Sequence, residues 1–196
     1  AGEDAADSAT VGVPRRADYH TGLSDFSLSG VRIGVMRGQQ GDRQDVRDVF
    51  DAALADLQAA GAELVEIEFE IDEEVYGASF TVLMYELREE MGKYLASLPG
   101  DDMPRSLADL IAFNEAHPQE EMRWFGQDLF TLAESTTDAE AYAEARAKAL
   151  RIAGEETLDK LMADNRVAFL VSPTRGPAWV SDLVNGDNFN GSIGVN

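Results

Sequence analysis

The sequence contains no cysteine and only two histidines, His20 and His117. The lack of cysteine excludes disulfide bridges, thiolate zinc sites, iron–sulfur clusters and a cysteine nucleophile. Neither histidine lies in an HExxH motif or beside a second metal ligand, so we expect no bound metal. There is also no Walker loop, and the stretch from Gly34 to Gly38 lacks the third glycine of a dinucleotide fingerprint. We therefore expect no cofactor.

Positive charge is scarce. The 196 residues include 16 Lys and Arg against 37 Asp and Glu, which gives a formal net charge of −21. Affinity for a nucleic-acid backbone or an anionic membrane surface comes chiefly from Lys and Arg, so we expect neither as a partner. No run approaches the ~18 consecutive apolar residues of a membrane-spanning helix, and no signal peptide is recognisable. The expected location is the cytoplasm.

Hydrophobic residues make up 44% of the chain, which is enough to bury a core. Residues 1–30 hold turn-forming residues without sustained apolar periodicity and are interpreted as a connector. Residues 31–71 are predicted to form a β-α-β unit, residues 72–165 a helical region, and residues 166–196 a buried strand followed by a pocket-forming loop. The expected fold class is α/β.

The β-α-β prediction depends on three changes of periodicity. Residues 31–36 alternate as a short strand, and apolar residues from 46 to 57 recur at helical spacing until Gly61 ends the helix. Between residues 65 and 71, apolar residues alternate with glutamates, as in a strand with one wet face. Two strands joined in this way are expected to be parallel, with a right-handed crossover.

Helical spacing dominates the next region. One long helix is predicted to bury a single stripe that consists of Tyr76, Phe80, Leu83, Leu87, Met91, Tyr94 and Leu98. Ser106 is the expected N-cap of a shorter helix that Pro118 ends, and the alanine-rich residues 136–164 predict another long helix. The apolar run at 167–171 predicts a central, buried strand.

Two specific functions for the acidic residues, catalysis and calcium binding, are less favoured. Adjacent acidic pairs such as Glu89-Glu90 could act as catalytic carboxylates, but neighbouring helical residues point about 100° apart, so solvated faces are the better interpretation. The oxygen-rich stretch at 182–191 could be a calcium loop. Its spacing does not match the EF-hand pattern, and we interpret it as a turn-rich loop.

Several stretches, in their order along the chain, resemble the amidase signature family of amide hydrolases. The carrying stretches include RSLADLIAFN at 105–114, FGQ at 125–127 and FLVSPTRGPAWVSDLVNGD at 169–187. RSLADLIAFN followed by SPTRGPAW and DLVNGD is the more specific combination. Weaker ones are LSGVRIGV at 28–35 and ALADLQAAGAELVEI at 53–67. Together they cover most of the chain and correspond to the part of the family that follows its catalytic signature. The resemblance implies a partial amidase-signature-type fold.

The resemblance further implies a serine hydrolase that cleaves a small-molecule carboxylic amide through an acyl-enzyme and releases ammonia or an amine. In the family, a lysine acts as base through a bridging serine held by a cis peptide, and a second serine attacks the carbonyl. Backbone N–H groups of a Gly/Ser-rich loop stabilise the oxyanion. This sequence has no such loop, and none of its three lysines fits a serine pattern, so we assign no catalytic residue.

The chain opens in connector-like residues and ends in a glycine-rich pattern at 194–196, and its parallel strands need neighbours. We therefore expect a fragment of one larger domain that lacks the nucleophile-bearing half and is inactive by itself. An apolar surface exposed where that half belongs would favour self-association.

Substrate contacts are expected in the loop that leaves the carboxyl end of the strand at 167–171, where α/β sheets build binding sites. The predicted substrate-binding residues are Thr174, Trp179, Asp182 and Asn185. Trp179 would form an apolar wall, and Asp182 or Asn185 would contact the amide. Arg175 could anchor a carboxylate, although a role in packing the loop is favoured.

Two other functions stay open. The first is the A subunit of a tRNA-dependent amidotransferase, for which the negative charge is unfavourable as a tRNA-binding face on this segment. The second is a non-catalytic, acidic α/β interaction module, which the missing nucleophile supports.

Overall fold

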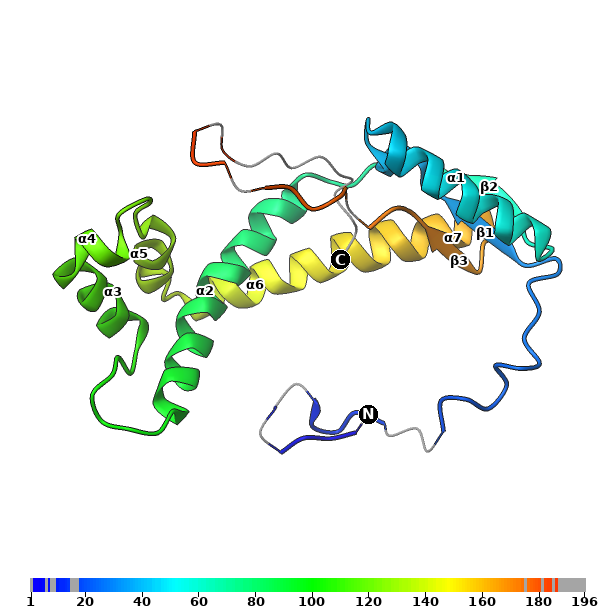
Figure 1. The fold of residues 1–196 in the computed structure, drawn as a ribbon. Coiled ribbons are helices and arrows are strands. Elements are labelled where there is room, and N and C mark those ends of the chain that lie inside the picture. The colour runs from blue at the N-terminus through cyan, green and yellow to red at the C-terminus, as the bar shows by residue number, and fades with distance from the viewer. Residues whose placement is uncertain are drawn as a thin grey trace. The chain divides into compact units, whose positions relative to one another are not determined.

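The computed structural model describes residues 2–5, 7, 10–14, 18–174, 176–180, 182–184 and 186. The described chain is α/β, mostly helical with a small parallel sheet, as predicted (Figure 1). It divides into two compact units. Of the described residues, those up to Glu66 and those from Val167 to Gly186 form the sheet unit, and residues 67–166 form the helical unit.

The sheet unit is built on a β-α-β motif. Both neighbours of the first strand run parallel to it, in the order β2-β1-β3. This confirms the predicted parallel β-α-β unit. The elements are β1 (Arg32–Val35), the short 3-10 helix η2 (Arg37–Gln40), α1 (Gln44–Ala59), β2 (Glu63–Glu66) and β3 (Phe169–Val171).

The second strand is shorter than its sequence pattern predicts. β2 covers Glu63–Glu66 and not residues 65–71, although the alternation continues to Ile71. The last register pair with β1 is Val35 with Glu66, so the residues beyond have no strand backbone to bond. Alternation reports which side chains share a face, and it does not report where the neighbouring strand ends.

The position predicted for the last strand is wrong. Within the described sheet β1 is central and β3 lies at an edge, and Phe169 of β3 is 47% exposed. The apolar run correctly predicted a strand, but it reflects what covers the faces of a strand and not which of its edges is paired. Phe26 of the connector packs edge-to-face against Phe169, with ring centroids 6.4 Å apart.

The core of the sheet unit joins α1 to the sheet. Val35, Phe50 and Leu54 are buried together, and the half-buried Leu57, Leu64 and Val171 pack against them. Phe50 and Leu54 are one turn apart on α1, so the helix presents one apolar face to β1. This contact positions the start of α1 beside the loops that leave β1 and β3.

The helical unit contains two long helical stretches and three shorter helices. α2 packs against α5 and α6, and α3 packs against α5 (Figure 1). The predicted 136–164 helix is confirmed, with a π-helical segment, η3, inside it. The elements are α2 (Glu74–Ser97), α3 (Leu107–Ala116), α4 (Pro118–Glu121), α5 (Asp128–Ser135), α6 (Ala139–Leu150), η3 (Arg151–Asp159) and α7 (Lys160–Asn165).

Leu107 is at the centre of the helical core, where it is buried with Met84 and Ala133. The predicted cap of α3 is confirmed, because the Ser106 side chain accepts a hydrogen bond from the backbone N–H of Asp109. The first backbone N–H groups of a helix have no hydrogen-bond partner within the helix, and a cap of this kind satisfies one of them.

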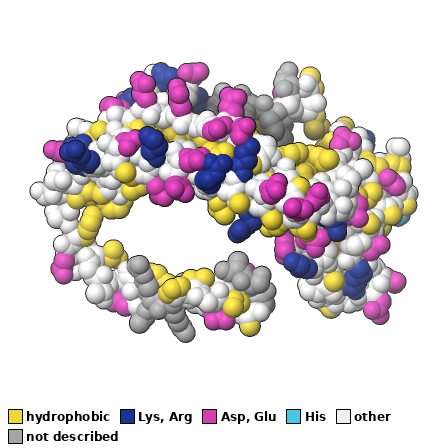
Figure 2. Space-filling model, turned by 180° about the vertical axis from the view of Figure 1, so that it is seen from behind, with side chains coloured by type: hydrophobic (Ala, Val, Ile, Leu, Met, Phe, Trp, Pro, Cys, Tyr) yellow, Lys and Arg dark blue, Asp and Glu magenta, His cyan; other side chains and the backbone are white. Residues whose placement is uncertain are grey.

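The stripe predicted along α2 is only partly buried. Leu87 and Met91 pack against the core, but Tyr76, Phe80, Leu83 and Tyr94 are between 45% and 60% exposed. α2 is apolar on more than one side, so spacing alone could not identify the packed face. Figure 2 shows apolar side chains that reach the surface between acidic and basic ones. None of the described helices has the length and apolar character needed to cross a bilayer.

Candidate functional site

A groove of about 450 Å³ lies at the carboxyl edge of the sheet, within the sheet unit. One wall comes from the first turns of α1 and the other from the loop after β3. Both walls follow the carboxyl ends of parallel strands, which is where open α/β sheets form their binding sites. The groove-lining residues are Asp45, Val46, Val49, Phe50, Pro173, Thr174, Gly176 and Pro177.

The groove is predominantly apolar. Val49 is 73% exposed, and Pro173 and Pro177 contribute apolar ring surface from the opposite wall. Two prolines also restrict the backbone of the loop on either side of Thr174, because each fixes its own φ. An apolar cleft with few polar groups, here the Thr174 hydroxyl and the Asp45 carboxylate, is typical of a small-molecule site.

Asp45 is held by its neighbour Arg43. The guanidinium donates two hydrogen bonds to the carboxylate, from Nε at 3.0 Å and from Nη2 at 2.6 Å. These bonds lower the pKa of Asp45 below its ordinary value. A carboxylate that stays ionised at neutral pH is poorly suited to act as a general acid, so Asp45 contributes charge to the groove rim.

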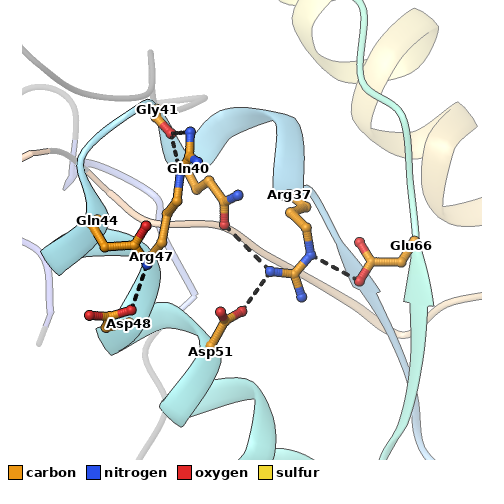
Figure 3. Close-up of polar contacts among 8 residues, drawn as sticks. All are labelled: Arg37, Gln40, Gly41, Gln44, Arg47, Asp48, Asp51 and Glu66. Carbon is orange, nitrogen blue, oxygen red and sulfur yellow. Dashed lines mark hydrogen bonds and ion pairs between the residues drawn. The ribbon is translucent and has the colours of Figure 1, made fainter.

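A polar network fixes the segment between β1 and α1 (Figure 3). Arg37 Nη1 is 2.7 Å from Oδ1 of Asp51 on α1, and Arg37 Nε is 3.2 Å from Oε1 of Glu66 at the end of β2. The hydrogen bond to Asp51 is the main cause that raises the pKa of Arg37. One guanidinium thus connects three parts of the β-α-β unit at the edge that carries the groove.

Arg47 secures the turn before α1. Its Nε and Nη2 donate to the carbonyl oxygen of Gly41 at 3.0 and 2.8 Å (Figure 3). Gly41 has a positive φ of 68°, a conformation that glycine adopts without strain. The turn therefore leads directly into the groove-lining end of α1.

Of the predicted substrate-binding residues that the structure describes, only one lies in the lining of the groove. Thr174 lines the groove, whereas Trp179, 38% exposed, is not among its lining residues. Asp182 Oδ1 accepts from the N–H of Val184, and the Asp182 carbonyl accepts from Gly186, as in a turn. Asn185 and Arg175 lie outside the described residues. No group of three or more acidic, histidine or cysteine side chains among the described residues has the arrangement of a metal site.

Sequence reasoning missed Val46 and Val49 as part of a site. Their helical spacing with Phe50 predicted a helix and no site, and of these three residues the structure buries only Phe50. The length of the apolar face of α1 could have indicated that part of it is left uncovered. A four-residue strand such as β1 cannot cover the full apolar face of a 16-residue helix.

Each of the three lysines is paired with a carboxylate. Lys93 pairs with Glu90, Lys148 with Glu74, and Lys160 with Asp164. Hydrogen bonding to Glu90 raises the pKa of Lys93 above its ordinary value. A lysine that activates a serine must reach the serine hydroxyl. In the described part of the chain, each lysine ammonium contacts a carboxylate and none contacts a serine hydroxyl, so these contacts do not support a base role for any of the three.

Comparison with known proteins identifies the class. The family model described as Amidase matches residues 1–185, and the chain therefore belongs to the amidase family, which confirms the resemblance. A peptide amidase, PAM, solved with the competitive inhibitor chymostatin, is 36% identical with a TM-score of 0.83, over 98% of this chain and 40% of that one. Native peptide amidase from Stenotrophomonas maltophilia is 34% identical with a TM-score of 0.80, over 98% of this chain and 39% of that one.

Curated relatives include the A subunit of glutamyl-tRNA(Gln) amidotransferase from Corynebacterium glutamicum, strain ATCC 13032. It is 27% identical over 185 residues, which are 89% of this chain and 36% of that protein. The chain thus spans about two fifths of the peptide amidases and about one third of this amidotransferase protein.

Proposed function

We propose that this chain forms a substrate-binding wall of an amidase that hydrolyses carboxylic amides to an acid and ammonia or an amine. The observation that carries the proposal is the apolar groove at the carboxyl edge of the sheet, in a chain that belongs to the amidase family. Its lining would hold an apolar group next to the amide, and the Thr174 hydroxyl would hydrogen-bond the amide itself. Trp179, Asp182 and Asn185 follow on the same segment and complete the proposed substrate-binding set.

The proposed reaction passes through an acyl-enzyme formed on a serine, and in this proposal the residues of this chain bind and orient the amide without making the attack. The pairing of all three lysines with carboxylates supports this division of roles. The chain alone is therefore expected to show no amide hydrolysis above background and no labelling by a serine-directed fluorophosphonate. Turnover that the reagent abolishes would contradict this part of the proposal.

A free-standing amidase is favoured over a component of an amidotransferase. Identity to the peptide amidases is 34–36% over 98% of the chain, against 27% over 89% for the amidotransferase protein. The net charge of −21 also opposes contact between this chain and tRNA phosphates.

Ligand binding tests the groove directly. We would titrate the full chain with N-acetylphenylalaninamide and follow the backbone amides by NMR, expecting shifts at Val46, Val49 and Gly176. Val49→Asp replaces apolar lining with charge and is expected to raise the Kd about tenfold. Val11→Asp is the matched control, because Val11 is 58% exposed and outside the groove, and it should leave the Kd unchanged.

Equal effects of the two substitutions, or shifts confined to residues outside the groove, would contradict the assignment of the site. The circular dichroism spectrum of each variant shows whether the chain is still folded.

A further inference from the structure

A second cavity, of about 360 Å³, lies in the helical unit where α3, α4 and α5 meet. Two of the stretches that carry the family resemblance, ending at Asn114 and Gln127, converge on it. Its lining combines apolar side chains with two carboxamides and two carboxylates. The lining residues are Asn114, Glu121, Met122, Phe125, Gly126, Gln127, Asp128, Leu129 and Phe130.

The two carboxamides hold each other in place. Asn114 Nδ2 donates to Gln127 Oε1 at 3.0 Å, and Gln127 Nε2 donates to the carbonyl oxygen of Ile111 at 3.2 Å. Both side chains are half-buried. Among the described residues nothing donates to the Asn114 Oδ1, which leaves a fixed acceptor at the cavity.

The cavity carries negative charge without a compensating cation. In the described part of the chain, no basic side chain pairs with Glu121 or Asp128. The nearest arginine in sequence, Arg123, has its guanidinium over the Trp124 ring, 4.7 Å from the centroid. Charge complementarity therefore favours a cationic ligand at the rim.

Apolar surface at the same cavity is left uncovered. Phe125 is 77% exposed and Leu129 is 56% exposed, and both line it. Covering these side chains with an apolar group removes their surface from water, which is favourable. A small, fully hydrated inorganic cation would leave this surface exposed.

We propose that this cavity binds a primary ammonium group carried on an apolar body. The three N–H donors of an ammonium match three acceptors, the carboxylates of Glu121 and Asp128 and the Asn114 Oδ1. The apolar body covers Phe125 and Leu129. A free aralkylamine and the N-terminal residue of an apolar peptide both present this chemistry. Binding of an ammonium group at this cavity does not require that the chain take part in amide hydrolysis.

Calorimetric titration of the full chain separates the ligand chemistries. Phenethylamine and the dipeptide Phe-Ala are the probes, and their N-acetylated forms, which lack the charge, are the controls. Binding of either probe at least about tenfold more tightly than its acetylated form supports the site, and the probe that binds identifies the source of the ammonium. No binding, or equal binding of the acetylated forms, overturns it.

Conservative variants locate the site. Glu121→Gln and Asp128→Asn keep side-chain volume and remove charge, and each is expected to raise the Kd of the bound probe about tenfold. Glu134→Gln is the matched control, because Glu134 lies on the same helix, α5, outside this cavity, and its Kd should stay within about twofold. Equal effects of the three variants, or NMR shifts that miss Gly126, overturn the proposal. Thermal melts of each variant verify folding.

Discussion

The guanidinium of Arg37 donates to the carboxylate of Asp51, with Nη1 and Oδ1 2.7 Å apart. Arg37 begins η2, one residue after the end of β1, and Asp51 is on α1, so the bond joins the segment that follows β1 to the helix that forms one wall of the groove. The same guanidinium lies over the Phe50 ring, 5.9 Å from its centroid. Because Arg37 contacts both Asp51 and the groove-lining Phe50, its polar network lies beside the apolar groove.

Arg37→Leu is expected to lower the free energy of unfolding by about 1 kcal/mol, since it removes a network of exposed pairs and not one isolated pair. Urea denaturation of the full chain measures the change. Arg43→Gln breaks only the local pair with Asp45 and should have a smaller effect. An effect of Arg43→Gln at least as large as that of Arg37→Leu would show that the network adds nothing.

Two glycine substitutions should have opposite signs. Gly61 has φ of +95°, and a Cβ there would come within 3.0 Å of the backbone Cα of Ser29. Gly61→Ala should therefore destabilise the chain by more than about 1 kcal/mol. Gly77 lies in α2 with no atom near an added Cβ, so Gly77→Ala should stabilise by about 0.5 kcal/mol. Thermal melts that shift in the same direction would contradict this account.

The cap of α3 should be sensitive to substitution. Ser106→Ala is expected to lower the free energy of unfolding by about 1 kcal/mol. Ser135→Ala, which removes only a hydroxyl bond to the carbonyl of Leu132 near the end of α5, should have a smaller effect. Urea denaturation measures both changes. A smaller effect at Ser106 than at Ser135 would argue against the cap.

The start of α3 should also be sensitive to acid. A hydrogen bond from the backbone N–H of Arg105 is the main cause that lowers the pKa of Asp109. A lowered folded-state pKa means that the carboxylate stabilises the fold above the unfolded pKa of about 4 and loses this contribution as the pH falls through the folded value. Stability measured by urea denaturation between pH 6 and pH 3 should fall less steeply in Asp109→Asn than in the unmodified chain. Identical slopes would count against the role of Asp109.

Tyr142 should ionise at a higher pH than an ordinary tyrosine. Its hydroxyl donates to Oε1 of Glu86 at 2.8 Å, and this bond is the main cause that raises the pKa of Tyr142. The bond stabilises the fold below the ordinary tyrosine pKa of about 10 and is lost as the pH rises through the folded value. Absorbance at about 295 nm should show a late phase that Tyr142→Phe removes and Glu86→Gln moves to lower pH. If the high-pH phase is unchanged in both variants, it belongs to a tyrosine other than Tyr142.

Much of the fold followed from the sequence. Helical spacing and the Ser106 cap predicted α2, α3 and the long helix correctly, because these signals are local and each helix satisfies its own backbone hydrogen bonds. The π-helical segment at 151–159 was not predicted, since its hydrogen-bond register leaves little mark in the side-chain pattern. Family membership also followed from the sequence, through the motifs at 105–114 and 172–187.

The candidate site was predicted only in part. Thr174 was assigned from the loop after a strand, because the topology of a parallel sheet places that loop at the carboxyl edge. Val46 and Val49, which form the opposite wall, look like core residues in the sequence. Spacing assigns them to the same apolar stripe as Phe50 and cannot show where the sheet beneath that stripe ends.

The sequence by itself determined which segments are helices and strands, that two of the strands are parallel, and the family to which the chain belongs. These properties depend on local periodicity, capping and short motifs. The tertiary structure alone decided that β3 lies at the edge of the described sheet, which face of α2 is packed, and that Asn114 and Gln127 meet at one cavity. Each of these depends on which distant segments come into contact, and a side-chain pattern records that a face is apolar without recording what covers it.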